Sequence, residues 1–165
     1  MSNYRSKRGF VLIVTCMVLV ILMAVAGLGI DIGRMYLIKN ELQAFADAAA
    51  LTAALRLDGT DQGIQGARQA PGELAAGPNA MKWDMGTQPI TGIAVGFAKG
   101  EGAPDSTSWQ AEPSGAADFH FVRVVASAQA PVIFLRVFQP LKADAALVAS
   151  ASVAVKTTQA ARLVQ

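Results

Sequence analysis

Few side chains in this sequence could perform chemistry. His120 is the single histidine and Cys16 the single cysteine. No cysteine or paired carboxylate stands beside His120 in its strand-like stretch, so a solvated or core-edge histidine explains it better than a catalytic or metal-binding one. No ligand spacing typical of zinc occurs. We therefore expect no enzyme, no cofactor or metal site and no small-molecule substrate.

The glycine-rich stretch 27–33 is a second candidate site. Its glycine spacing differs from that of dinucleotide sites, and no strand precedes it. Gly29 and Gly33 instead form a small-xxx-small pair, which allows two helix backbones to approach closely in a membrane. The alternative is a helix weakened where it leaves the lipid, since each glycine costs up to about 1 kcal/mol relative to alanine. The hypothesis is that both glycines contact another helix.

Three charged residues accompany this glycine pair along the same predicted helix. Asp31 and Arg34 lie three apart, so they can pair with each other or with a neighbouring chain at the level of the lipid headgroups. As an exposed ion pair they would add little to the stability of the fold, so contact with a partner would better explain their presence. Asp47 lies on a polar stripe further along. We expect all three to take part in helix packing or partner contact.

The element that carries these residues begins with an apolar run from Phe10 to Ile30 without any charged side chain. A bilayer core needs roughly 20 such residues in a helix. Arg5, Lys7 and Arg8 precede the run, and basic flanks tend to stay in the cytoplasm, so the remainder should be exported. The alternative is a cleavable signal peptide ending at Ala26, although hydrophobicity continues past that point. We predict an uncleaved single-pass anchor.

From Asp31 to Leu57 apolar residues recur at spacings of three and four, which predicts an amphipathic extension of the same helix. The combined helix has about 45 to 48 residues. The stretch from Gly59 to Pro89 is predicted to be mostly loop, with a short possible helix at 65–70. The expected strands are 90–98, 119–128 and 146–157.

The segment between the last two strands, Val132 to Phe138, is predicted to form one or two helical turns. Its Phe134, Leu135 and Phe138 are core candidates. The fold class is α+β, with a long N-terminal helix, transmembrane and then amphipathic, packed on a small, mainly antiparallel β-sheet. The middle strand has no purely polar face, which predicts a sheet covered on both sides.

The domain organisation follows from these elements: a basic cytoplasmic flank at 1–9, a transmembrane helix at 10–30, its extension at 31–57 and a small exported domain at 58–165. The net charge of +2 disappears once the N-terminal cluster is set aside, so no nucleic-acid partner is expected. Because the single cysteine lies in the span, the exported part must be stabilised by packing or by neighbouring subunits.

An ordered set of motifs resembles a known family. Gly27 to Leu37, with its glycines, aspartate and arginine, and then Leu42 to Leu51, with its Asp-Ala-Ala-Ala-Leu, look like the N-terminal module of TadG-like proteins of the tight-adherence (Flp) pilus systems. The resemblance covers residues 8–57. It implies a pseudopilin-like component of a pilus or secretion apparatus in a bacterial inner membrane, without catalysis. The implied partners are membrane lipid, other pilus-assembly or pseudopilin subunits and possibly a second copy.

Two functional hypotheses remain open. The first is a membrane-anchored assembly component whose C-terminal domain is periplasmic or extracellular. The second is a binding module or adhesin, released by cleavage after Ala26, whose loops around Trp83 and Trp109, with Asp84, meet a ligand; such tryptophans more often fill a core. Pilins typically carry glutamate five residues into the mature helix, and counting from Phe10 that position is Val14. The resemblance therefore favours a supporting role over the pilus shaft.

Overall fold

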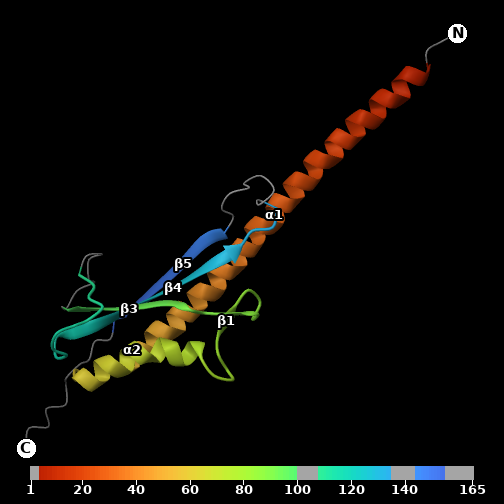
Figure 1. Cartoon of the computed structure of the whole chain (residues 1–165). Helices are drawn as coiled ribbons and strands as arrows, with labels where there is room; N and C mark the ends of the chain where they lie inside the picture. Colours follow the sequence, from red (N-terminus) through yellow and green to blue (C-terminus); the bar gives the residue numbers. More distant parts are fainter. Residues whose placement is uncertain (1–3, 100–107, 135–143, 155–165) are drawn as a thin grey trace, which may run out of the picture. The chain divides into compact units, whose positions relative to one another are not determined.

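The computed structural model describes residues 4–99, 108–134 and 144–154, with side chains for 9–99 and 108–134 (Figure 1). It contains a long N-terminal helix, a short helix and two small sheets, which confirms the predicted α+β class. The chain separates into two compact units. The first joins Met1–Tyr36 to Ala130–Ala145, and the second joins Leu37–Gln129 to Ala146–Gln165.

The long helix, α1, runs from Tyr4 to Leu55 over 52 residues. It begins six residues before the predicted apolar run and ends two residues before the predicted end at Leu57. Its sequence is rich in alanine and leucine, has no proline, and so favours an uninterrupted helix. The hydroxyl of Thr15 donates to the carbonyl oxygen of Val11 at 2.8 Å, so this polar group is satisfied within the helix.

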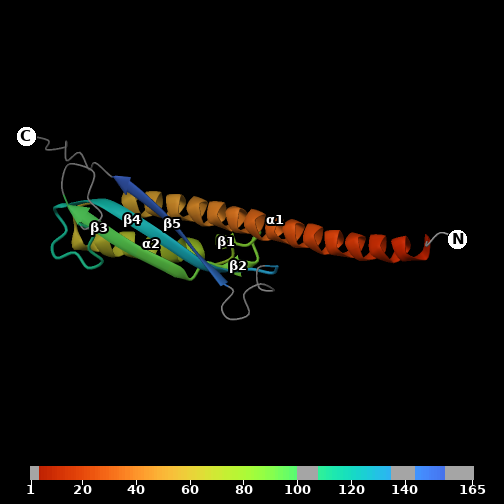
Figure 2. The same ribbon diagram turned by 90° about the horizontal axis from the view of Figure 1, so that it is seen from above.

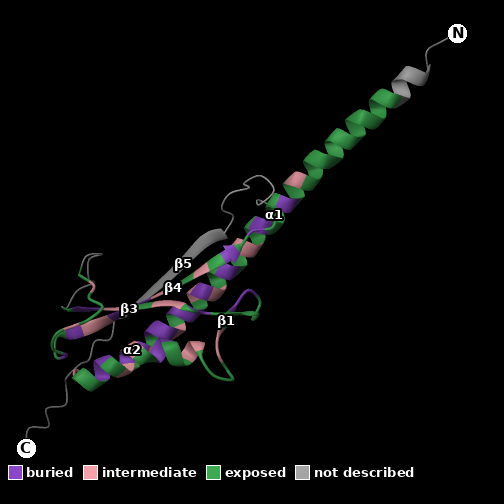
Figure 3. Ribbon diagram, viewed as in Figure 1, coloured by how far each residue is buried: buried purple, intermediate pink, exposed green. Residues whose placement is uncertain are grey.

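In the first unit, the N-terminal half of α1 exposes its apolar side chains on every side. Phe10 is 69% exposed and Met23 is 71% exposed, and the large apolar residues between them are exposed as well. Figure 3 shows this stretch as exposed along its whole length. Burial begins only near Gly27 and Asp31.

In the second unit, α2 runs from Asp61 to Ala75 and is much longer than the short possible helix predicted at 65–70. The prediction of mostly loop between Gly59 and Pro89 is therefore wrong. The hydroxyl oxygen of Thr60 caps α2 by accepting the N–H of Gly63 at 3.0 Å. The buried face of α2 consists of small or compact residues rather than leucines, and its glycines and proline look like loop signals; these buried residues are Gly63, Ile64, Ala67, Ala70 and Pro71.

The three predicted strands are confirmed, with shifted ends. They are β3 (Gly92–Lys99), β4 (Phe119–Pro131) and β5 (Asp144–Ala154), and β4 is central in the order β3-β4-β5. β3 is antiparallel to β4, with Val95 opposite Val124. The side chains of β5, and with them the predicted alternation of its faces, lie outside the described residues.

A small hairpin precedes this sheet and was not predicted. It pairs β1 (Lys82–Trp83) with β2 (Gln88–Pro89) in an antiparallel register. Its turn places Asp84 and Met85 at a φ of 56° each, a left-handed conformation that few side chains adopt without support. Two-residue strands give no period-2 pattern, so the sequence carried no strand signal here.

The core of the second unit lies between the end of α1, α2 and the sheet. Figure 2 shows β3 and β4 running beside α2. One face of β4 is buried in this core and the other is half-buried, where the ring of Trp109 lies 4.8 Å from the guanidinium of Arg123. The core cluster comprises Ala53, Ala54, Leu57, Ile64, Ala67, Ala70, Phe97, Ala116, Phe119 and Val122.

The segment after β4 is described only as far as Phe134, so most of the helical turns predicted at 132–138 fall outside the described residues. Ile133 and Phe134 form a bend rather than a helical turn, and Phe134 is 37% exposed rather than part of the core. Both backbone N–H groups donate to the carboxylate of Asp31 on α1. Leu135 and Phe138 lie outside the described residues.

Candidate functional site

Asp31 is the buried carboxylate of the first unit, with a side chain only 2% exposed. Its Oδ1 accepts the backbone N–H of Ile133 at 3.1 Å, and its Oδ2 accepts that of Phe134 at 2.8 Å. Hydrogen bonds to an ionised acceptor are roughly twice as strong as neutral ones. One acidic side chain therefore attaches the segment after β4 to α1.

Gly27 lies one turn before Asp31 on the same side of α1 and is also buried. A Cβ added at Gly27 would overlap the Phe134 side chain and come within 2.9 Å of its Cβ. The absence of a side chain at Gly27 thus allows Phe134 to pack directly on the helix backbone. We call Gly27, Asp31, Ile133 and Phe134 the Asp31 cluster.

The predicted glycine pair lies elsewhere on α1. At 100° per residue, Gly29 and Gly33 are on the side of the helix away from Gly27 and Asp31. Both are exposed, and a Cβ added to either would meet no atom within 4 Å. The structure therefore separates two sets of residues that the sequence grouped together: one side of α1 holds a segment of its own chain, and the other is open.

The remaining predicted site residues have different surroundings. Arg34 is half-buried on the same side of α1 as Asp31. Asp47, in the second unit, is exposed and accepts a hydrogen bond from Nε2 of Gln43 at 2.9 Å. The side chains of the orienting residues lie outside the described residues; these are Arg5, Lys7 and Arg8.

The tryptophan region is built for packing. Trp83 is buried, and its Nε1 donates to the carbonyl oxygen of Pro89 at 2.9 Å, which braces the hairpin. The carboxylate of Glu41, on α1, accepts the N–H of Met85 at 3.0 Å and so supports the left-handed turn. Trp83 thus fills the core of the hairpin rather than a ligand site.

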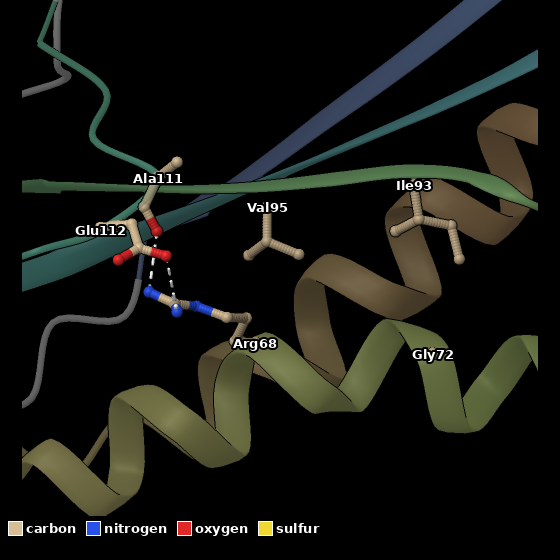
Figure 4. A pocket seen from close by; sticks show the side chains of 6 residues that line it. All are labelled: Arg68, Gly72, Ile93, Val95, Ala111 and Glu112. Atoms are coloured by element: carbon tan, nitrogen blue, oxygen red, sulfur yellow. Dashed lines mark hydrogen bonds and ion pairs between the residues drawn. The ribbon is translucent and has the colours of Figure 1, made fainter.

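A shallow cleft of about 330 Å³ lies between α2, β3 and the segment before β4 (Figure 4). Arg68, the cation that could attract a ligand, donates to the carbonyl oxygen of Ala111 at 2.8 Å and to the carboxylate of Glu112 at 3.4 Å. These bonds tie α2 to the loop and occupy the guanidinium. The lining residues are Arg68, Gly72, Ile93, Val95, Ala111 and Glu112.

Metal-binding and catalytic geometry was also sought. Within residues 4–99, 108–134 and 144–154, no three histidine, cysteine, aspartate or glutamate side chains gather as a metal site. His120, in β4, is half-buried. The described contacts of Asp31 and Asp47 on α1 are hydrogen bonds to the bend after β4 and to Gln43.

A comparison with protein families shows which family α1 is similar to. Residues 9–56 match the family described as "Putative Flp pilus-assembly TadE/G-like". This segment is similar to the TadE/G-like family, and we call it the TadE/G-like module. The match confirms the resemblance drawn from the sequence and coincides with α1 almost end to end. No curated protein and no solved structure matches the chain.

The TadE/G-like module contains both the Asp31 side and the open glycine side of α1. By length and composition, α1 is also the one helix among the described residues that could cross a membrane. The match and the apolar helix together fit a component of pilus assembly. Ile133 and Phe134 lie outside the module. No pattern in the sequence predicted that they would contact Asp31 and Gly27 within it.

Proposed function

We propose that this protein is a single-pass, inner-membrane component of a Flp-type (tight-adherence) pilus apparatus, pseudopilin-like in its leading helix, with an assembly rather than a catalytic role. The observation that carries the proposal is the exposure of apolar side chains on all sides of α1 within its TadE/G-like module. A helix that is apolar all round is stable only in a protein core or in lipid.

Lipid is the better environment for this half of α1, because the described chain covers none of residues 10–23. On a membrane-insertion scale each leucine, isoleucine, phenylalanine or valine contributes about 0.3 to 0.6 kcal/mol at the centre of a span. We place the span at 10–30 and the extension at 31–57. Arg5, Lys7 and Arg8 orient the N-terminus to the cytoplasm, which puts the domain at 58–165 in the periplasm or outside the cell.

Gly29 and Gly33 are the proposed contact for a partner helix, either from another pilus subunit or from a second copy. Their support is the open space around both positions, on the side of α1 that the Asp31 cluster leaves free. Arg34 and Asp47 are proposed to contribute charged contacts to the same assembly. With Val14 at the position where pilins typically carry glutamate, a supporting role at the base of the pilus is favoured over the shaft.

The released binding module is the less favoured function. It requires cleavage after Ala26, but α1 is continuous there and the next residue, Gly27, is buried against Phe134. A signal peptidase acts on an extended, accessible segment. Cleavage would therefore require both an unwound helix and a dismantled Asp31 cluster.

The deciding experiment is the intact mass and membrane partitioning of the protein extracted from its native cell envelope. The proposal expects the full-length mass in the detergent-extracted inner-membrane fraction. A mass beginning at Gly27 in the soluble exported fraction would overturn it in favour of the binding module. A mass beginning at Phe10 would instead indicate pilin-like processing.

The glycine contact is tested by a matched pair of substitutions on opposite sides of α1. We expect Gly29→Leu to weaken co-purification with membrane partners, because a leucine would keep the partner helix at a distance. Gly27→Leu, two residues away, should leave partner capture intact while displacing Phe134. Crosslinking in intact membranes measures the first effect. Equal capture by the wild type and the Gly29→Leu variant would rule out the proposed contact.

A further inference from the structure

We propose that the bend formed by Ile133 and Phe134 is a second membrane contact, which inserts its apolar side chains into the lipid interface where α1 leaves the bilayer. The inference rests on the proposed function, because it requires α1 to span lipid. Its partner is the bilayer itself, at the boundary between headgroups and acyl chains.

The position of the bend along α1 sets its depth. Phe134 packs on Gly27, and Ile133 and Phe134 both bind Asp31, so the bend is level with the last turn of the proposed span. The neighbouring apolar side chains of α1 at this level, Leu28 and Ile30, are themselves exposed. Lipid that contacts Leu28 and Ile30 would therefore contact the bend at the same depth in the bilayer.

The exposed side chains of the bend are suited to such an environment. Ile133 is 54% exposed and Phe134 is 37% exposed, and neither carries a charge or a polar group. They continue the apolar surface of α1 without interruption, since the Phe134 side chain rests on the helix backbone itself. A bilayer that covers the helix covers this extension as well.

The two N–H groups of the bend already have partners, as a site with little water requires of them. Non-helical backbone cannot face hydrocarbon unless its N–H and C=O groups have partners. The N–H groups of Ile133 and Phe134 are both accepted by Asp31, and Pro131 has no N–H. In return, these two N–H groups compensate the buried charge of Asp31.

Depth-dependent fluorescence quenching tests this contact in the full-length chain, reconstituted into phosphatidylethanolamine–phosphatidylglycerol vesicles. An environment-sensitive fluorophore is attached to one of three positions: native Cys16, Ile133→Cys, or Gln69→Cys, the last two in a Cys16→Ala background. Cys16 is exposed within the proposed span, and Gln69 is exposed on α2 as the matched aqueous control. The quenchers are iodide in the water and lipids spin-labelled near the headgroup or deep in the acyl chain.

We expect the label on the Ile133→Cys variant to be quenched severalfold more by the shallow spin-labelled lipid than the label on Gln69→Cys, and less by iodide. Equal iodide quenching of the two variants would overturn the inference. Shielding from both iodide and lipid would also overturn it, and would indicate that protein covers the bend. The Cys16 label distinguishes failure of the membrane anchor from failure of the second contact. If the lipid spin-labelled deep in the acyl chain does not quench the Cys16 label, the proposed anchor is wrong. If the spin-labelled lipids quench the label on Cys16 but not the label on Ile133→Cys, only the second contact is rejected.

Discussion

Asp31 combines a formal charge with almost complete burial, and its two oxygens explain why this is tolerated. Each oxygen accepts a backbone N–H, from Ile133 at 3.1 Å and from Phe134 at 2.8 Å. Asparagine would offer a single neutral acceptor oxygen and alanine none, so both substitutions should weaken this attachment, alanine the more. At the scale of single residues, Asp31 links a helix to a segment about one hundred positions further along the chain.

The Asp31→Ala substitution should release this segment. We expect backbone hydrogen exchange at Ile133 and Phe134 to accelerate by about ten- to hundredfold, since a lost hydrogen bond to a charged group costs about 1.5 to 3 kcal/mol. Asn at position 31 should have a smaller effect. Hydrogen-exchange mass spectrometry in detergent measures the change, with Asp47→Ala as a control on an exposed aspartate of the same helix. Unaltered exchange at both amides would refute the role given to Asp31.

At the scale of elements, the junction between α1 and α2 depends on charged and capping groups. The guanidinium of Arg56 donates to both carboxylate oxygens of Glu73, which lowers the pKa of Glu73 below its ordinary value of 4.5. The hydroxyl and N–H of Thr60 both donate to Asp58 and lower the pKa of its carboxyl below 3.8. Both acids are therefore more stable in the charged form when the junction is folded.

This junction should weaken in acid. A carboxyl with a lowered folded pKa contributes stability above its unfolded pKa, and that contribution is lost as pH falls through the folded value. We expect Glu73→Gln to be slightly less stable than wild type above pH 4.5, with the difference disappearing below it. Thermal unfolding followed by tryptophan fluorescence across this range measures the effect. A difference that persists at low pH would mean that the Arg56 pairing is not its source.

At the scale of the whole molecule, the proposed export of the C-terminal domain assigns a topological role to the basic N-terminal flank. Arg5, Lys7 and Arg8 contribute three of the 14 basic residues in the chain, and they precede the apolar run directly. Basic residues near the end of a span resist translocation. In the proposed topology, this flank sets which side of the membrane receives the sheet.

Reversal of these three charges to glutamate should retain a substantial fraction of the C-terminal domain in the cytoplasm. Protease accessibility of that domain in spheroplasts measures its location. Lys82→Glu changes a charge far from the span and should leave the topology unaltered. Full export of the triple variant would show that orientation is decided elsewhere in the chain.

Local periodicity made much of the fold predictable. Helical hydrogen bonds join residues four apart, so the pattern from Phe10 to Leu57 was sufficient to predict α1. The three strands of the larger sheet were visible for the same reason, because alternation and β-branched residues are local signals. In contrast, the extent of α2 was underestimated, because its buried face uses small residues, among them Gly63 and Ala67, that resemble a loop in composition.

The sequence by itself determined α1, the three strands of the larger sheet, the resemblance to the TadE/G-like family and the position of Gly29, Asp31 and Gly33 on one helix. Only the tertiary structure decided that they have different surroundings, with Asp31 bound to Ile133 and Phe134 and the two glycines open. The physical reason is the sequence separation of the residues in contact. Periodicity reports contacts within about one helical turn, whereas the partners of Asp31 lie more than 100 residues away and are selected by chain topology.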